Sequence, residues 1–202
     1  MISEKIKLSF YKNSLIKQYY LWKYANYSLG SKEWLIHSEI KYGGIATKVK
    51  RNRISNLDPR SQKIVNKGGM IGGDRMLYHG YANKYSQYFL PYIQNSIPII
   101  LVEVGILKGV GLALWCDLFP NGRIIGFDID LNHFKNNQNN LQNLGAFINN
   151  KPELYEFDQF EDNRKYIKDI INHDKINICI DDGLHSNQSI MQTMKSITPF
   201  LD

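Results

Sequence analysis

The apolar and polar positions of this 202-residue chain follow two periods along its second half. Short apolar runs that indicate buried strands occur at residues 99–104, 123–128, 153–157 and 176–180. Apolar positions at helical spacing fill the stretches between these runs and predict helices at residues 109–119 and 131–144 and, further on, around Ile167 and Met191. Strands that alternate with helices form a mainly parallel sheet with helices on both faces. The sequence therefore predicts a doubly wound α/β fold.

The first third of the chain lacks this alternation. Residues 1–42 are mostly helical in pattern and rich in aromatic side chains, which we expect to pack against the rest of the protein. Residues 43–74 hold three glycine pairs and the basic run at 48–53, which predict a linker or a mobile lid. We therefore divide the chain into a basic helical arm with its linker, residues 1–67, and a main domain, residues 68–202.

The formal charge of +6 is concentrated in the arm. Residues 1–66 carry 13 Lys or Arg against 4 Asp or Glu, whereas residues 67–202 carry 12 against 15. A basic arm suits an anionic partner such as nucleic acid or a membrane surface. Lysines scattered among aromatic residues are more typical of a solvated surface, and we favour this interpretation.

The remaining composition indicates an ordinary globular protein. Cys116 and Cys179 lie in apolar stretches without metal-ligand spacing, so we expect free thiols in a reducing, cytoplasmic setting. No apolar run has signal-peptide character or approaches the ~20 residues of a membrane-spanning helix, so we expect no membrane partner.

A glycine turn follows the first predicted strand. Glu103 lies near the end of that strand, and Gly105 and Gly109 precede a predicted helix, so the backbone can approach a ligand at the helix N-terminus. The spacing G-x-x-x-G differs from the G-x-G-x-x-G of dinucleotide-binding proteins. The carboxylate would repel a pyrophosphate, but it suits a cofactor that carries positive charge and no phosphate. The alternative is a turn whose glycines serve packing alone.

Carboxylates also follow the second and third predicted strands. Asp128 lies 23 residues beyond Gly105, where an acid can accept hydrogen bonds from both ribose hydroxyls of an adenosine cofactor. Asp158 and Gln159 offer a carboxylate and an amide where an adenine edge would lie, although helix capping explains Asp158 equally well. Ligands bind beyond the carboxyl ends of strands in such sheets, so we expect these side chains around one ligand.

The fourth predicted strand ends in the segment Asp181-Asp182-Gly183-Leu184-His185. Two adjacent carboxylates at the mouth of a buried strand are costly unless they are paired, solvated or bound to a cation. Mg²⁺ on Asp182 and a neutral imidazole on His185 could together deprotonate a substrate hydroxyl, because the metal lowers the hydroxyl pKa and the histidine takes the proton. The alternative is an aspartate that caps the next helix beside a surface histidine.

Together these segments resemble the class I S-adenosylmethionine-dependent methyltransferases. They are most similar to metal-dependent O-methyltransferases that act on sugar hydroxyls of macrolides, and to related cephalosporin-hydroxylase-like proteins. The similarity covers roughly residues 68–202 and depends on the order of the motifs. These motifs are Glu103-x-Gly105-x-x-x-Gly109, Asp128, Asp158-Gln159, Asp181-Asp182-Gly183-x-His185 and, upstream, Gly73-Asp74-Arg75 with His79-Gly80-Tyr81.

The resemblance implies how S-adenosylmethionine would bind. The glycine loop of Gly105 and Gly109 would carry the methionine part, with Glu103 near its ammonium. Asp128 would hold the ribose. The adenine would face the third strand end, at Asp158 and Gln159.

The resemblance also implies a reacting end of the site. Asp74 and His79 would lie near the cofactor or the substrate entrance, and Asp181 is assigned to the cofactor site as well. Asp182 would be a Mg²⁺ ligand and His185 the general base. The expected activity is therefore O-methylation of a small, sugar-like or secondary-metabolite substrate.

One departure from the resembled family concerns the end of the sequence. In that family a fifth strand, further metal carboxylates and two more strands follow, whereas this sequence stops at Asp202, where the fifth strand would begin. We therefore expect a Rossmann-like sheet truncated after its fourth strand, in the order 3-2-1-4, with an apolar edge.

The alternative to a complete enzyme is a non-catalytic module that keeps the cofactor pocket without the full metal site. Separately, the aromatic arm and the open edge make a homodimer plausible. Methylation of nucleic acid is disfavoured, because the sequence lacks the aromatic–proline tetrapeptide used on flipped bases.

Overall fold

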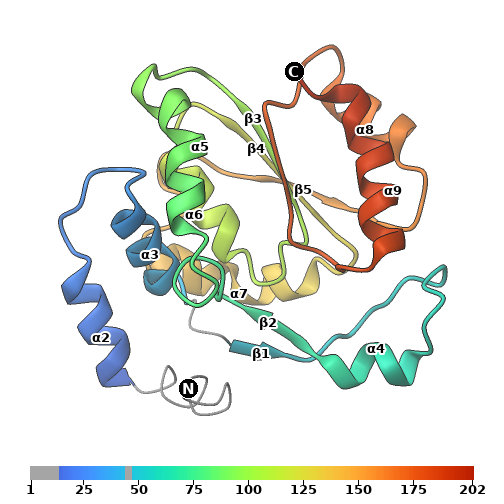
Figure 1. Cartoon of the computed structure of the whole chain (residues 1–202), viewed down its shortest axis with the longest axis horizontal. Helices are drawn as coiled ribbons and strands as arrows, with labels where there is room; N and C mark the ends of the chain where they lie inside the picture. Colours follow the sequence, from blue (N-terminus) through green and yellow to red (C-terminus); the bar gives the residue numbers. More distant parts are fainter. Residues whose placement is uncertain (1–13, 44–46) are drawn as a thin grey trace.

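The computed structural model of the chain describes residues 14–43 and 47–202, and a four-stranded parallel sheet forms its centre (Figure 1). The strands are β3 (Ile100–Val104), β4 (Arg123–Asp128), β5 (Glu153–Glu156) and β6 (Ile178–Asp181), in the spatial order β5-β4-β3-β6. Val102 of the central strand pairs with Ile125 on one side and with Cys179 on the other. The predicted spatial order and the Rossmann-like parallel sheet are therefore confirmed.

Helices cover both faces of the sheet. They are α5 (Ala82–Gln94), α6 (Val110–Leu118), α7 (Asn132–Asn143), α8 (Arg164–Ile171) and α9 (Asn187–Ile197), followed by the 3-10 turn η1 (Thr198–Phe200). Alternate strand residues point to opposite faces. Leu101 and Ile124 accordingly join a core formed with α5, α6 and α7, whereas Val102 and Ile125 join a second core with α8 and α9. The predicted doubly wound arrangement is therefore confirmed.

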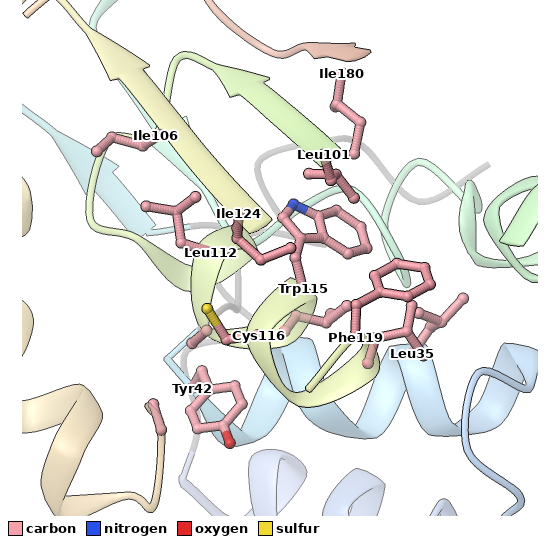
Figure 2. Close-up of a cluster of buried hydrophobic side chains, with 14 of the residues drawn as sticks. Leu35, Tyr42, Leu101, Ile106, Leu112, Trp115, Cys116, Phe119, Ile124 and Ile180 are labelled. Carbon is pink, nitrogen blue, oxygen red and sulfur yellow. The ribbon is translucent and has the colours of Figure 1, made fainter. Parts of the chain in front are cut away.

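The helical arm packs into the first of these cores. It comprises α2 (Ser14–Lys23) and α3 (Lys32–Lys41). Leu35 and Tyr42 are fully buried, and they belong to the same cluster as Trp115 and Phe119 (Figure 2). The arm therefore shares an apolar core with the sheet, and the division of the chain at residue 67 stays a prediction. In the described part of the chain, no helix has the length and apolar character needed to cross a bilayer.

Residues 47–72 form a small excursion from the sheet, in the region predicted as a linker or lid. β1 (Thr47–Val49) pairs antiparallel with β2 (Met70–Gly72), and α4 (Gln62–Gly68) lies between them in sequence. Strands of three residues are too short for a periodic pattern, so hydropathy did not identify them. In Figure 1 the excursion runs along the lower side of the molecule, below the carboxyl ends of the parallel strands.

The outer edge of β6 is partly covered, which corrects the expectation of a bare apolar edge. Ile176 forms a parallel bridge with Leu201 just before β6 begins. The Ile176 N–H donates to the Phe200 carbonyl at 2.8 Å, and the Asp202 N–H donates to the Ile176 carbonyl at 3.0 Å. The residues after α9 therefore turn back to run beside the sheet.

Candidate functional site

A cavity of about 440 Å³ opens at the carboxyl edge of the sheet. Its floor comes from the loops that follow all four parallel strands, and its roof comes from the excursion at residues 47–72. The part of the roof that matters most below is the segment of residues 50–58, which we call the strap. The volume is that of a small-molecule site, and the location is where open α/β sheets bind ligands.

Gly105 allows two strand-end loops to meet at the floor of the cavity. Its φ is +86°, and its N–H donates to the Phe127 carbonyl at 2.7 Å. A Cβ at this position would overlap the backbone of Asp182 and Gly183, so glycine is needed for the close approach. Gly109, with a φ of +77°, begins α6 but does not line the cavity, because it packs against the Phe134 ring. Packing therefore explains Gly109, whereas Gly105 both packs and lines the site.

Asp128 lines the cavity at the end of β4 and is held by backbone groups. Its Oδ2 accepts from the Leu107 N–H and its Oδ1 accepts from the Asp130 N–H, both at 2.9 Å. Burial raises the pKa of Asp128, and these two backbone donors lower it in part. Each carboxylate oxygen can accept a further hydrogen bond, so the group is oriented and still available to a ligand.

The third and fourth strand ends are braced through Gln159. Its Nε2 donates at 3.0 Å to both Asp181 Oδ1 and Thr193 Oγ1, and its Oε1 accepts from the Leu184 N–H at 2.6 Å. Asp181 is turned toward this amide and does not line the cavity. Asp158 does line it, and its Oδ1 accepts from the Phe160 N–H at 3.0 Å. Of these three groups, Asp158 is therefore best disposed toward a ligand.

Glu103 lies behind the cavity wall and is neutralised by the protein itself. The carboxylate is 1% exposed and pairs with Arg75, whose Nη1 lies 2.5 Å from Glu103 Oε1 and 3.4 Å from Asp182 Oδ2. Burial opposes the charge on Arg75, but the two carboxylates outweigh it and raise the Arg75 pKa. Sequence reasoning expected an ammonium near Glu103 and assigned no role to Arg75, although it quoted the segment that contains this residue.

A second buried acid, Glu39 on α3, supports the same loop. Its Oε2 accepts from the Met76 N–H at 2.9 Å, next to Arg75. Burial raises the pKa of Glu39 to about 7, although the Arg75 charge lowers it in part. No motif marks this residue, because a single glutamate in an aromatic-rich helix gives no signal of its partner 37 residues away.

Two histidines, His79 and His185, line the cavity. The Nε2 of His185 lies 3.2 Å from the Asp181 carbonyl oxygen, which can only accept, so the proton of the neutral ring sits on Nε2 and Nδ1 is the basic nitrogen. His79 Nε2 lies 3.2 Å from Asp74 Oδ2, and its ring stacks on Tyr81. Asp74, His79, Asp182 and His185 therefore all line one end of the site.

The residues of this end do not fit a Mg²⁺ ion. Magnesium requires oxygen ligands in octahedral array, whereas the neighbour of Asp182 is the Arg75 guanidinium. Among residues 14–43 and 47–202, no group of three or more His, Cys, Asp or Glu side chains is arranged to hold a metal. The assignment of Asp182 as a metal ligand stays a prediction that the described residues do not favour.

Comparisons with known proteins find only distant structural similarity. No protein-family model and no curated protein matches the sequence. Two matching solved structures are the MycE methyltransferase from the mycinamycin biosynthetic pathway, one in complex with Mg, SAH and mycinamycin VI and the other with Mg and SAH. Each is 15% identical and aligns over 82% of this chain and 49% of its own, with TM-scores of 0.36 and 0.38 respectively. This chain therefore spans about half the length of those proteins.

Proposed function

We propose that this chain binds S-adenosylmethionine in the cavity and is an O-methyltransferase of a small, sugar-like or secondary-metabolite hydroxyl substrate. The observation that carries the proposal is the convergence of Gly105, Asp128 and Asp158 on one edge of the sheet, in one cavity with His185. A glycine turn that the ligand can approach closely, an oriented acid with free lone pairs and a second acid suit an adenosine ligand.

The same observations support a direction for the ligand in the cavity. The ribose hydroxyls would donate to Asp128, and the exocyclic amine of adenine would donate to Asp158. The methionine half would then extend over Gly105 toward Asp182 and Asp74, whose carboxylates suit a cationic ligand. Because Glu103 is buried behind Arg75 whereas Asp74 and Asp182 line the cavity, these two acids replace Glu103 as the expected partners of the cofactor's ammonium and sulfonium.

Methyl transfer needs alignment and one proton acceptor. S-adenosylmethionine supplies the methyl group on a sulfonium. The substrate oxygen forms a bond to this methyl carbon while the carbon–sulfur bond breaks, and the sulfur keeps the electron pair as a neutral thioether. His185 Nδ1 accepts the hydroxyl proton, and its Nε2–H stays bonded to the Asp181 carbonyl oxygen. The floor and the roof of the cavity would hold the two reactants in line.

The first experiment measures binding by isothermal titration with S-adenosylmethionine and S-adenosylhomocysteine. We expect saturable binding that Asp128→Asn weakens by roughly tenfold or more, since a hydrogen bond to a charged group contributes about 1.5–3 kcal/mol. Asp174→Asn is the matched control, because this exposed acid lies outside the cavity and should leave affinity unchanged. Absence of binding by either ligand would contradict the proposal.

The second experiment separates an enzyme from a binding module. Release of S-adenosylhomocysteine is followed with a panel of sugar-hydroxyl acceptors, both with Mg²⁺ and with a chelator. Turnover that His185→Ala abolishes and the exposed His173→Ala leaves intact supports the methyltransferase. Binding without turnover on every acceptor supports the alternative, a module that keeps only the cofactor site.

A further inference from the structure

The strap presents three consecutive polar side chains, those of Arg51, Asn52 and Arg53. Asn52 Nδ2 lies 3.3 Å from His133 Nε2 near the start of α7, and Arg53 Nη1 lies 2.9 Å from Glu156 Oε2 at the end of β5. These contacts hold the strap across the carboxyl ends of β4 and β5. All three residues line the cavity, and Arg51, which precedes the other two, is the least exposed of them.

The Arg51 guanidinium differs from its two neighbours on the strap. It makes no hydrogen bond or ion pair with any residue of the part of the chain that the structure describes, although its side chain is half-buried. Burial and the charge of Arg60 both lower the Arg51 pKa, while Asp58 and Asp128 raise it in part. Of these two acids Asp58 has the larger effect, but it is already bound by Arg60 through two hydrogen bonds of 2.8 and 3.0 Å. A half-buried guanidinium without a hydrogen-bond partner loses part of its hydration, and a ligand that covers it could replace those lost contacts.

The position of Arg51 indicates which part of a ligand it would meet. Asp128 is near enough to influence its charge, and the tethers on either side of it lead to α7 and β5. The adenine of a ligand whose ribose rests on Asp128 would lie between the ends of β4 and β5, directly under the strap. An arginine side chain is planar and stacks readily on aromatic rings.

We propose that Arg51 binds the adenosine half of the ligand, with its guanidinium against the adenine, and that the strap exists to hold it there. The inference rests on the proposed function, because it takes the ligand to be an adenosine compound. It adds a binding residue from the segment before the Rossmann-like sheet, on the opposite side of the ligand from Asp128.

The test uses adenosine and S-adenosylhomocysteine as probes on the full chain. Arg51→Ala should weaken both ligands by about tenfold and by the same factor, since the lost contact belongs to the half they share. Arg51→Lys should recover only part of the loss, because lysine keeps the charge but not the plane. Lys50→Ala is the matched control. Lys50 is an exposed neighbour with the same charge, so this variant should bind both ligands like the wild type.

Three results would overturn the inference. If Arg51→Ala bound both probes as tightly as the wild type, Arg51 would not contact the ligand, and the proposed function would stay intact. Tighter binding of adenosine 3′-phosphate than of adenosine, lost in Arg51→Ala, would identify a phosphate subsite instead. Failure of the wild-type chain to bind S-adenosylhomocysteine would remove the proposed function and this inference together.

Discussion

The two ends of the cavity use charge in opposite ways. At one end Arg75 lies between the buried Glu103 and the partly exposed Asp182, so the protein supplies a counter-charge itself, while Glu103 Oε2 has no hydrogen-bond partner among the described residues. At the other end backbone N–H groups hold Asp128, while Arg51 on the strap has no partner among the described residues. Glu103 therefore has a counter-charge without any ligand, whereas the second end leaves an acid and a cation that a ligand could join. We expect the charge of Arg75 to contribute mainly to stability and the charge of Arg51 mainly to the proposed ligand binding.

The largest expected effect on stability comes from removing the positive charge of Arg75. Arg75→Met would leave Glu103 buried without its counter-charge, and we expect a loss of about 3–5 kcal/mol in the free energy of unfolding, measured with urea. Arg53→Met, which removes the exposed tether to Glu156, should cost less than about 1 kcal/mol.

A double variant checks the cause of this loss. Arg75→Met combined with Glu103→Leu removes both charges, so most of the lost stability should return. If the double variant were as unstable as Arg75→Met alone, packing around Trp115 rather than charge would explain the role of Arg75.

The pH dependence of stability sharpens the comparison at the same end. Burial disfavours the Glu39 carboxylate and raises its pKa from the ordinary 4.5 to about 7 in the folded chain. Between these values the unfolded chain has lost the proton that the folded chain retains, so stability falls as pH rises from about 4.5 to 7. The amide of Glu39→Gln does not titrate in this range. Its free energy of unfolding should therefore equal that of the wild type near pH 4.5 and exceed it by about 3 kcal/mol at pH 8. An equal difference at both pH values would contradict the buried-acid explanation.

The sequence was most informative about the sheet, and the reason is physical. A strand buried on both faces reads as an apolar run, and the polar residue that ends the run must lie at the sheet edge. Asp128 and Asp158 could therefore be expected at the cavity from their places in the chain alone. The predicted spatial order also followed from the fold that the motifs resembled, and the register is observed directly.

Contacts between segments without periodicity could not be predicted in this way. Arg75 and Glu103 are 28 residues apart, and the loop that carries Arg75 has no regular pattern to fix its direction. Arg51 was visible only as part of a basic run. The sequence does not show that its side chain is half-buried at the cavity without a partner among the described residues, whereas its exposed neighbours Asn52 and Arg53 have partners at α7 and β5. Charge in a sequence shows which residues need partners, but only the fold shows which of them remain without one.

The glycine at the floor of the cavity offers a third test. Gly105→Ala would bring a Cβ into the backbone of Gly183 at a φ of +86°, and we expect a loss of roughly 2–3 kcal/mol in stability. Gly80→Ala is the matched control, because Gly80 has a similar φ of +73° and open space around its Cβ position, so it should cost about 1 kcal/mol. Equal losses in the two variants would mean that backbone conformation alone, and not the close approach of the loops, requires glycine at position 105.

The smallest expected effect lies at the strap. Glu156→Gln removes a contact whose two side chains are 54% and 59% exposed, so the free energy of unfolding should change by less than about 1 kcal/mol. The strap would nevertheless be less firmly held over the ligand, and we expect S-adenosylhomocysteine to bind about two- to threefold more weakly in titration at low salt. Salt screens an exposed ion pair, so this difference from the wild type should disappear near 1 M NaCl. A much larger loss of affinity that persisted at high salt would mean that Glu156 itself contacts the ligand. Its role would then be direct binding and not the positioning of the strap.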